Sequence, residues 1–386
     1  MNAEQLKSAR SHFPYLDKGI IYFNHASDSP ISTEVKKVIV DFVNSRSDDC
    51  DFDYKSFLKR AEETKQILAE MMNCEKDRIA FSENTSTGLN ILAQGIDWKA
   101  GDIILLNDVE FPANVYPFLN LEKKRVKIEY IKAKNGILTA EDVIESIKPQ
   151  TKLISISFVQ FLSGYRVDLE KIGSVCREKN IILSVDAIQG LGAVRLDVTK
   201  SKIDFLSCGT QKWMMGIQGL SFIYLTKDLQ DKIDTVPSGW LSVDDAWNLL
   251  DYKLKFKETA SRYQPGTLNT AAIYALNAAL KFFKQFGFDE VERQIISNSK
   301  YFIKKLSELG YYSPLKNLDY KYLAGIVSII TDRAGEIFNH LSNKKIICSD
   351  RAGYLRFSPH FYNTVDEIDK VVAELKNISN LTTWNS

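Results

Sequence analysis

The sequence predicts an α/β fold in which a mostly parallel central sheet is flanked by helices and followed by a smaller C-terminal α+β lobe. Between residues 79 and 226, short β-rich runs alternate with helical patterns, which is typical of βαβ units whose parallel sheet is covered on both faces. After residue 270 the pattern changes to two long helical segments and a shorter α+β segment. The length of 386 residues exceeds a typical single domain and also favours two lobes.

The first part of the chain supplies the strands of the expected sheet and the helices between them. Leu169 and Ile172 mark one apolar face of a helix over residues 168–179. Thr139 and Asp142 have the spacing of an N-terminal capping pair for another helix. The predicted strands span residues 78–81, 102–106, 127–131, 153–159, 181–186, 204–208 and 220–225.

The second part of the chain predicts helices over residues 271–286, 289–309 and 365–378. The boundary near residues 255–270 does not have the composition of a flexible linker, so the two lobes should pack tightly. Such folds place ligands in a cleft at the carboxyl ends of the parallel strands. The expected domains are an N-terminal arm at 1–20, a large ligand-binding domain at 21–260, and a small C-terminal domain at 261–386 against which the N-terminal segment could pack.

The composition argues against several classes of partner. The chain has 50 Lys and Arg against 49 Asp and Glu, and a net charge of +1 gives no overall attraction to nucleic acid or to a membrane surface. No stretch approaches the roughly 20 apolar residues of a membrane span, and we expect a cytoplasmic protein. The five cysteines and four histidines lack the spacing of a disulfide framework or a metal site, so we expect no metal.

Two strand ends carry the clearest chemical signal. Asp186 ends the apolar run IILSVD, where a carboxylate is costly unless it meets a cation such as a protonated pyridine nitrogen. Lys212 lies in the turn CGTQKWMMG after the next strand, and a lysine partly removed from water has a lowered pKa and forms an imine with an aldehyde. Taken singly, Asp186 could cap a turn and Lys212 could be a solvated surface lysine. The two together favour a site for a pyridine aldehyde.

An ordered set of motifs runs through nearly the whole chain, from IYFNHASDSP (residues 21–30) to LRFSPHFYNT (residues 355–364). With the Asp186 and Lys212 segments, these motifs resemble the class V aminotransferase family of fold-type I pyridoxal-phosphate enzymes, which includes cysteine desulfurases, kynureninases and isopenicillin N epimerase-like proteins. The resemblance implies pyridoxal 5'-phosphate as cofactor. It also implies an enzyme that acts on an amino acid or related amine through an external aldimine.

The resemblance assigns roles around the cofactor ring. Lys212 would form the imine with the cofactor and move the substrate's proton, and Asp186 would pair with the pyridinium nitrogen. Gln189 is placed to hydrogen-bond the phenolic oxygen, unless it caps a turn, and Gln160 stands where many relatives have an asparagine near that oxygen. Phe111, in VEFPANVYP, would stack on the ring, although aromatic residues at strand ends often only pack in a core.

Further residues match the family's phosphate contacts. Thr85 and Ser86, in SENTSTGLN, stand where a strand enters a helix, a position that suits an anion, although a simple helix cap is the alternative. Gln211 replaces a histidine that many relatives place near the phosphate. Thr267, in RYQPGTLN, matches a threonine that reaches the phosphate of the neighbouring subunit, which implies a homodimer with shared active sites; a Pro-Gly turn before a helix is the alternative.

Three residues are expected at the substrate. Arg356 matches an arginine that binds a substrate carboxylate through two hydrogen bonds. The alternative is an ordinary surface arginine without a role in binding. Asn24 and His25 match a stretch that lines the substrate mouth, although His25 could equally be structural.

The reaction type is less defined than the cofactor. The resemblance favours an aminotransferase-like reaction, with a kynureninase-like lyase or an epimerase as the alternative. Cysteine desulfurases rank lower, because the chain passes from Gly353 directly to Tyr354 without their cysteine-bearing insertion, and Cys348 has the setting of a core residue. A cofactor-binding protein without turnover also ranks lower, because a carboxylate clamp is useful mainly for a substrate. The Gly190-Leu191-Gly192 segment lacks the context of a nicotinamide-binding motif.

Overall fold

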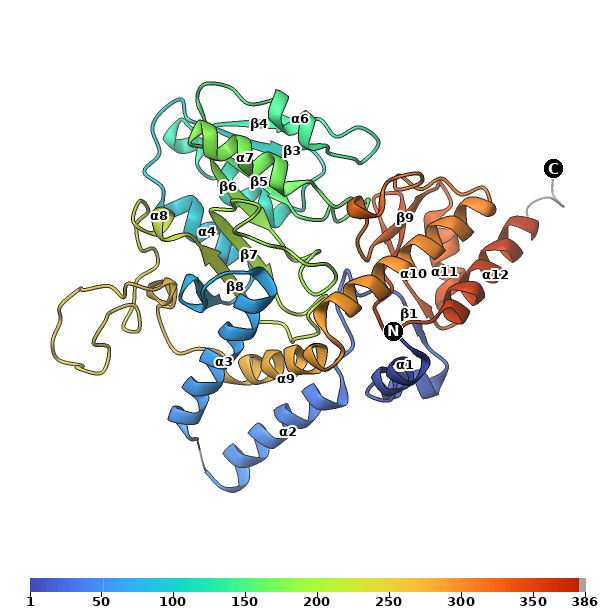
Figure 1. Cartoon of the computed structure of the whole chain (residues 1–386), viewed down its shortest axis with the longest axis horizontal. Helices are drawn as coiled ribbons and strands as arrows, with labels where there is room; N and C mark the ends of the chain where they lie inside the picture. The colour runs from blue at the N-terminus through green and yellow to red at the C-terminus, as the bar shows by residue number, and fades with distance from the viewer. Residues whose placement is uncertain (51, 382–386) are drawn as a thin grey trace.

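The computed structural model describes residues 1–50 and 52–381 as two packed lobes (Figure 1). Residue 51 of the predicted large domain and residues 382–386 of the predicted small domain lie outside the described residues. None of the helices in the described part of the chain combines the length and the apolar character needed to cross a membrane.

Each of the predicted strands forms part of one seven-stranded sheet with the order β2-β8-β7-β6-β5-β3-β4. β8 pairs antiparallel with both of its neighbours, and the other adjacent pairs are parallel. The predicted mostly parallel sheet is therefore confirmed. The strands are β2 (Ile79–Ser82), β3 (Ile103–Asn107), β4 (Lys127–Ile131), β5 (Thr151–Ser157), β6 (Ile182–Asp186), β7 (Phe205–Gly209) and β8 (Ser221–Leu225).

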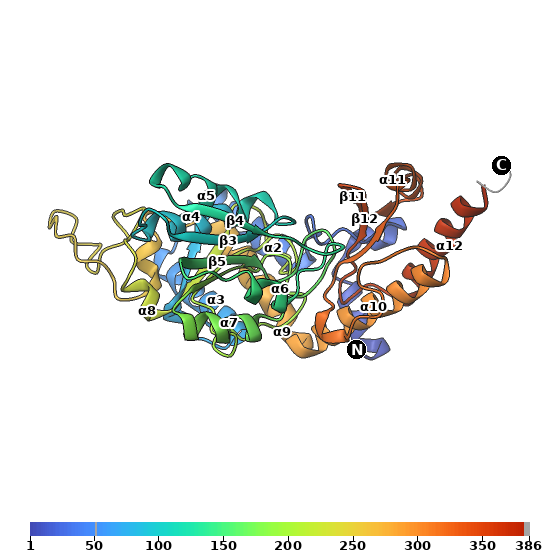
Figure 2. The same ribbon diagram turned by 90° about the horizontal axis from the view of Figure 1, so that it is seen from above.

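Helices cover both faces of this sheet. Figure 2 shows α4 and α5 on one side of it and α3 and α7 on the other. Successive side chains of β3 point to opposite faces, so Ile104 packs in the cluster that contains Leu92 of α4, while Ile103 and Leu105 belong to the cluster that contains Ile172 of α7. Burial on both faces explains why the strands read as continuous apolar runs.

Local capping signals begin several helices. The predicted pair at α6 is present: the Asp142 N–H donates to Thr139 Oγ1, and the Thr139 N–H donates to the Asp142 carboxylate. Asn84 and Asn269 cap α4 and α9 in a similar way. The helices up to this point are α1 (Ala3–Arg10), α2 (Thr33–Asp48), α3 (Tyr54–Met72), α4 (Thr85–Gly95), α5 (Tyr116–Leu119), α6 (Ala140–Glu145), α7 (Leu169–Lys179), α8 (Lys227–Gln230) and α9 (Thr270–Phe286).

The second lobe contains a three-stranded sheet and the remaining helices, and the N-terminus packs against it. The Arg10 guanidinium pairs with Glu367 at 2.9 Å, and Phe13 stacks on Tyr362 with ring centroids 4.0 Å apart. β1 pairs parallel with β10, so residues 21–22 join the second lobe as well. The elements are β1 (Ile21–Tyr22), α10 (Phe288–Glu308), β9 (Val327–Ile330), α11 (Ala334–Asn343), β10 (Ile346–Ile347), β11 (Ser349–Arg351), β12 (Tyr354–Phe357) and α12 (Val365–Leu381).

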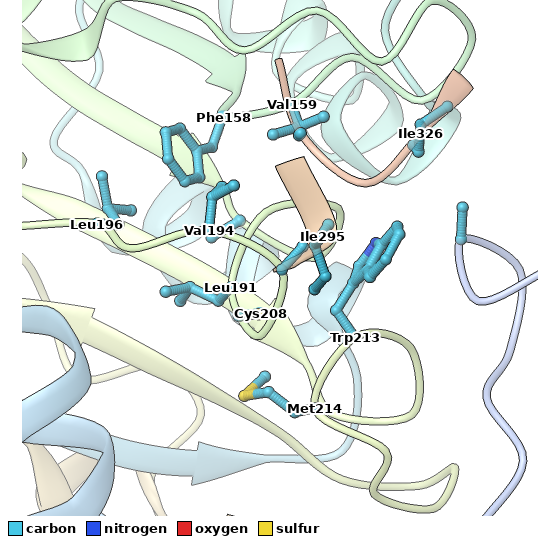
Figure 3. Packing of buried hydrophobic residues seen from close by; sticks show 14 of the residues in the cluster. Phe158, Val159, Leu191, Val194, Leu196, Cys208, Trp213, Met214, Ile295 and Ile326 are labelled. Atoms are coloured by element: carbon cyan, nitrogen blue, oxygen red, sulfur yellow. The ribbon is translucent and has the colours of Figure 1, made fainter. Parts of the chain in front are cut away.

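An apolar interface joins the lobes close to Lys212. Figure 3 shows Trp213, the residue after this lysine, beside Ile295 of α10, and Met214 and Ile326 belong to the same apolar cluster. Trp213 is almost fully buried, and a Cβ added at Gly325 would lie 2.1 Å from the Trp213 ring. Glycine at 325 therefore leaves space for the indole, and the indole fixes the turn that carries the lysine between the two lobes.

Candidate active site

A cavity of about 300 Å³ lies at the carboxyl ends of β6 and β7, between the start of α4 and the β11–β12 hairpin. This is the edge at which open α/β sheets place their ligands. The sequence-predicted residues that line the cavity are Thr85, Ser86, Phe111, Asp186, Gln189, Gln211, Lys212 and Arg356.

Lys212 follows β7 and projects into this cavity. Burial lowers the pKa of its amine to about 8; the negative charge of Asp186 acts in the opposite direction, and the charges of Arg356 and Arg351 add to the lowering. Its Nζ atom lies 5.7 Å from the centroid of the Phe111 ring. A lysine with such a pKa has an appreciable unprotonated fraction near neutral pH, which is the nucleophilic form.

Asp186 ends β6 on the neighbouring strand and is 2% exposed. Burial raises the pKa of its carboxyl to about 7, the Ile188 N–H that donates to its Oδ1 at 3.0 Å lowers it, and the negative charge of Glu110 raises it. Among the described residues it takes part in no ion pair. A buried carboxylate in this state would be stabilised by a cationic ring nitrogen in the cavity.

The start of α4 forms the wall of the cavity nearest to β7. The Gly209 N–H donates to Thr85 Oγ1 at 3.0 Å, and Ser207 Oγ donates to the Thr85 carbonyl at 3.0 Å. These bonds draw the helix so close to the strand that a Cβ at Gly88 would lie 2.2 Å from Ser207 Oγ. The N–H groups of a first helical turn have no partner within the helix, and Thr85 and Ser86 line the cavity, so this wall suits an anion such as a phosphate.

Two glutamines tie the N-terminal segment to the lysine turn. Gln189 Nε2 donates to the Ala26 carbonyl at 3.0 Å, and its Oε1 accepts from the indole N–H of Trp213 at 3.2 Å. The carbonyl of Gln211 accepts from the Ser29 N–H at 3.0 Å. Both side chains reach the cavity while these bonds hold the segments around it.

Arg356 lies on β12 and is almost fully buried, and its hydrogen-bond partners in the described part of the chain are all neutral. Its guanidinium donates to the Phe161 carbonyl at 2.6 Å, to Ser27 Oγ at 2.9 Å and to Ser349 Oγ at 3.2 Å. Burial first, and then the charge of Arg351, lower the pKa of Arg356 to about 9, so it stays charged at neutral pH. A buried cation without a carboxylate partner, facing a cavity, suits an anionic ligand.

A second and larger cavity, of about 450 Å³, lies beside Arg166 and Arg195. Here each arginine already has a carboxylate: Arg166 pairs with Glu292 at 2.8 Å, and Arg195 pairs with Asp289 at 2.8 Å. In the smaller cavity neither of the lining arginines, Arg351 and Arg356, pairs with a carboxylate of the described residues, and we therefore take it as the candidate active site.

Four predicted residues do not line the candidate site. His25 is fully buried behind it, and its ring nitrogens contact the Ser358 carbonyl and the Tyr362 hydroxyl, each at 2.8 Å. Burial lowers the pKa of His25 to about 3, so it is neutral. Asn24 forms a β-bridge with Ser358, Gln160 Nε2 donates to the buried Glu110 carboxylate at 3.2 Å, and Thr267 is exposed on the surface.

The structure adds residues that the motifs did not single out. Ser27, Phe161 and Arg351 line the candidate site, and the Phe161 ring packs edge-on against Phe111 with centroids 5.3 Å apart. Glu110 accepts from Asn107 Nδ2 at 2.6 Å and from Ser157 Oγ at 2.6 Å, which holds the segment before Phe111. For Arg351, the hairpin sequence SDRAGYLRF contained a usable signal. Residues two apart on a strand share a face, so Arg351 could be expected on the same face as Ser349.

The fold and the site together define a class, the fold-type I enzymes that use pyridoxal phosphate. The family model described as aminotransferase class-V matches residues 21–371, and the chain belongs to this family. The match confirms the predicted family, the assignment as an enzyme and the pyridoxal 5'-phosphate cofactor.

Similar proteins cover most of the chain. A protein of Bacillus subtilis (strain 168) named "Uncharacterized aminotransferase YcbU" is 26% identical over 349 residues, which are 90% of this chain and 92% of that protein. A "Probable cysteine desulfurase" of Pyrococcus abyssi is 31% identical over 343 residues, 83% of each chain.

Solved structures share the fold. The apo cysteine desulfurase of Thermococcus onnurineus NA1 superposes with a TM-score of 0.86 at 24% identity, over 96% of this chain and 97% of that one. The cystine C-S lyase C-DES, solved in complex with cysteine persulfide, has a TM-score of 0.86 at 22% identity, over 95% of this chain and 99% of its own. The predicted fold class is therefore confirmed.

Proposed function

We propose that this enzyme binds an amino acid by its carboxylate at Arg356 and carries out an aminotransferase-like reaction at Lys212. The observation that carries the proposal is the position of Arg356: its buried guanidinium, which has neutral partners, faces the same cavity as the half-buried Lys212, whose pKa is lowered. An α-amino acid has an anionic group and an amine that could meet these two residues together.

The residues around the cavity fit the cofactor. When bound, pyridoxal phosphate supplies an aldehyde that condenses with amines and a ring that stabilises negative charge on a substrate carbon. Lys212 Nζ would hold the aldehyde carbon, Asp186 the ring nitrogen, and the start of α4, with Thr85 and Ser86, the phosphate. Three further residues are proposed to contact the cofactor: Phe111 would lie against its ring, and Gln189 and Gln211 would lie near its polar groups. Gln160 would act indirectly, because it contacts Glu110 and does not line the cavity.

Lys212 is also the group in the cavity best suited to move a proton. With its pKa near 8, the amine can accept a proton from the substrate's α carbon and return one near neutral pH. Arg356 holds the carboxylate on that carbon, so the position of the carbon relative to Nζ depends on the β12 strand. This arrangement orients the substrate without any further acid or base.

The β11–β12 hairpin favours reactions that need no cysteine nucleophile. Only Ala352 and Gly353 join the two strands, both with positive φ, so there is no room for a cysteine-bearing loop between Arg351 and Tyr354. Cys348 is buried, burial raises the pKa of its thiol to about 12, and it does not line the site. Desulfuration by a cysteine thiolate therefore ranks below an aminotransferase-like reaction and below its alternatives, a lyase or an epimerase, although several relatives are named as probable desulfurases.

A homodimer with shared active sites is part of the proposal. Residues 240–254, here called the apolar loop, project from the large lobe as a segment without helix or strand (Figure 1). Within this loop Leu250 is 82% exposed and Tyr252 is 89% exposed. Exposed apolar side chains in such number suit a protein interface, and the surface position of Thr267 suits a contact with a second copy.

A screen of amino acids against the purified holoenzyme tests the proposed function. Binding should change the absorbance of the bound cofactor, and product analysis for keto acid, alanine, ammonia or sulfide separates aminotransferase from lyase and desulfurase. Racemised substrate with no other product would indicate the epimerase. A holoenzyme whose absorbance does not respond to any amino acid would contradict the proposal.

A further inference from the structure

A second arginine faces the candidate site on the same hairpin as Arg356. β11 and β12 pair antiparallel with Ser349 opposite Arg356 and Arg351 opposite Tyr354. Residues two apart on a strand share a face, so Arg351 lies on the face where Ser349 contacts the Arg356 guanidinium. Arg351 and Arg356 both line the cavity.

Arg351 has no partner of its own within the part of the chain that the structure describes. It takes part in none of the side-chain hydrogen bonds or ion pairs found there, and its side chain is exposed. Its neighbour Asp350 points to the other face of the hairpin, where its carboxylate lies near Gly335. The guanidinium is therefore available to a ligand in the cavity.

The charges around the cavity are unbalanced. Among the described residues that line it, three have cationic side chains, Lys212, Arg351 and Arg356, and one has a carboxylate, Asp186. The nearby Asp28 accepts a hydrogen bond from Gln218 at 2.8 Å and does not line the cavity. The positive charge of Arg351 repels both other cations, and this repulsion contributes to lowering the pKa of Arg356 and of Lys212.

One guanidinium is enough for one substrate carboxylate, and Arg356 is the buried and fixed one. A second anionic group between the arginines would relieve their mutual repulsion and give Arg351 a charge-assisted partner. The Phe161 ring also lines the cavity, and its carbonyl accepts from Arg356, so a short apolar spacer next to the α carbon has a surface to pack against.

We propose that Arg351 binds a side-chain carboxylate of the substrate, so that the enzyme prefers dicarboxylic amino acids to neutral ones of the same shape. This inference rests on the proposed function, since it assigns the side-chain end of a substrate whose α-carboxylate Arg356 holds. Arg351 is then the residue that determines specificity, and a cationic substrate side chain is disfavoured by the same charge.

The test measures how tightly the holoenzyme binds pairs of amino acids that have the same shape but differ in side-chain charge. Aspartate is compared with asparagine, and glutamate with glutamine, by the first rapid change in cofactor absorbance on mixing. The wild-type protein should bind at least one acid about tenfold or more tightly than its amide. In Arg351→Gln this preference should fall to about one, with a much larger loss of affinity for the acid than any change for the amide and with cofactor still bound, and Arg351→Lys should keep part of the preference.

The matched control is Arg333→Gln, which removes an arginine of the same lobe that pairs with Glu336 and does not line the cavity. It should behave as the wild type. Equal affinity of the wild type for acids and amides would overturn the inference and leave the proposed function standing. An equal loss of acid and amide binding in Arg351→Gln would also overturn the inference. A loss of cofactor in this variant would overturn it too, because it would place Arg351 at the cofactor. Absence of any response to amino acids would instead contradict the proposed function.

Discussion

The candidate site and the apolar loop depart from the usual distribution of side chains in opposite ways. The site buries the charged groups of Asp186 and Arg356 and half-buries that of Lys212, whereas the loop exposes large apolar side chains such as Leu250 and Tyr252. Charged residues are rarely buried without partners, and apolar residues are rarely exposed in groups. The difference is the basis of two proposals: a small charged ligand in the cavity and a second copy of the chain against the loop.

The largest expected effect concerns the Lys212 amine. Lys212→Ala should remove the covalent link to the cofactor and reduce turnover by roughly 10²–10⁴-fold through loss of proton transfer alone. Borohydride reduction of the wild-type holoenzyme, followed by peptide mass spectrometry, should find the cofactor mass on Lys212, and the variant should show none. Lys123→Ala, at an exposed lysine outside the cavity, is the control. A cofactor fixed to another lysine would show that the site is misplaced.

The next effect tests whether the buried guanidinium serves the substrate or the fold. Arg356→Gln should weaken amino-acid binding by about 1.5–3 kcal/mol, roughly ten- to hundredfold, because a charge-assisted contact is lost. Cofactor content should not change. Thermal unfolding of the variant serves as a check, since Arg356 also holds Phe161 and Ser27. Loss of cofactor in parallel with loss of amino-acid binding would mean that Arg356 has a different role.

The third prediction tests whether the apolar loop forms the proposed dimer interface. Replacing Leu250 and Tyr252 together by Ser should weaken a dimer by at least about tenfold in its dissociation constant, because exposed anchors of this kind dominate interfaces. Sedimentation at several concentrations measures the change. Tyr312→Ser, at a half-exposed aromatic in the other lobe, is the control. A wild-type chain that is monomeric with full cofactor content would contradict the shared-site dimer.

A further expected effect is a pH dependence of stability in the cofactor-free protein. The pKa of Asp186 is raised from 3.8 to about 7 on folding, so the folded state binds more protons than the unfolded state between these values, and stability falls as the pH rises through that window. In the variant Asp186→Asn the side chain at this position is neutral over the whole pH range. Its stability relative to the wild type should therefore be greater at pH 8 than at pH 5 in urea unfolding. The same difference at both pH values would show that the buried carboxyl titrates normally.

Local sequence patterns predicted the strands and helices closely. The runs ending at Asp186 and before Lys212 are β6 and β7, because a parallel strand covered on both faces needs an uninterrupted apolar sequence. The predicted pairing of these residues at one cavity follows, since adjacent parallel strands end at the same edge. The domain boundaries at 20 and 260 stay predictions.

Neighbouring residues in one motif have different surroundings. His25 and Ser27 share the segment 21–30, but Ser27 reaches the cavity, whereas His25 is enclosed by Ser358, Tyr362 and Trp213. Arg351 and Arg356 share a hairpin, yet only Arg356 is buried with fixed partners. Sequence spacing does not contain this information, because the contacts come from segments more than 300 residues apart along the chain.

The sequence by itself determined the α/β fold, the strand ends that bear Asp186 and Lys212, and the family with its cofactor. Strand and helix periodicity and the order of motifs depend on residues close together in the chain, so they can be read without a structure. Only the tertiary structure decided which side chains face one cavity, that Arg356 has neutral partners within residues 1–50 and 52–381, and that Arg351 lines the same cavity. Those properties arise when the second lobe packs over the carboxyl ends of the sheet, where burial changes the energy of each charge.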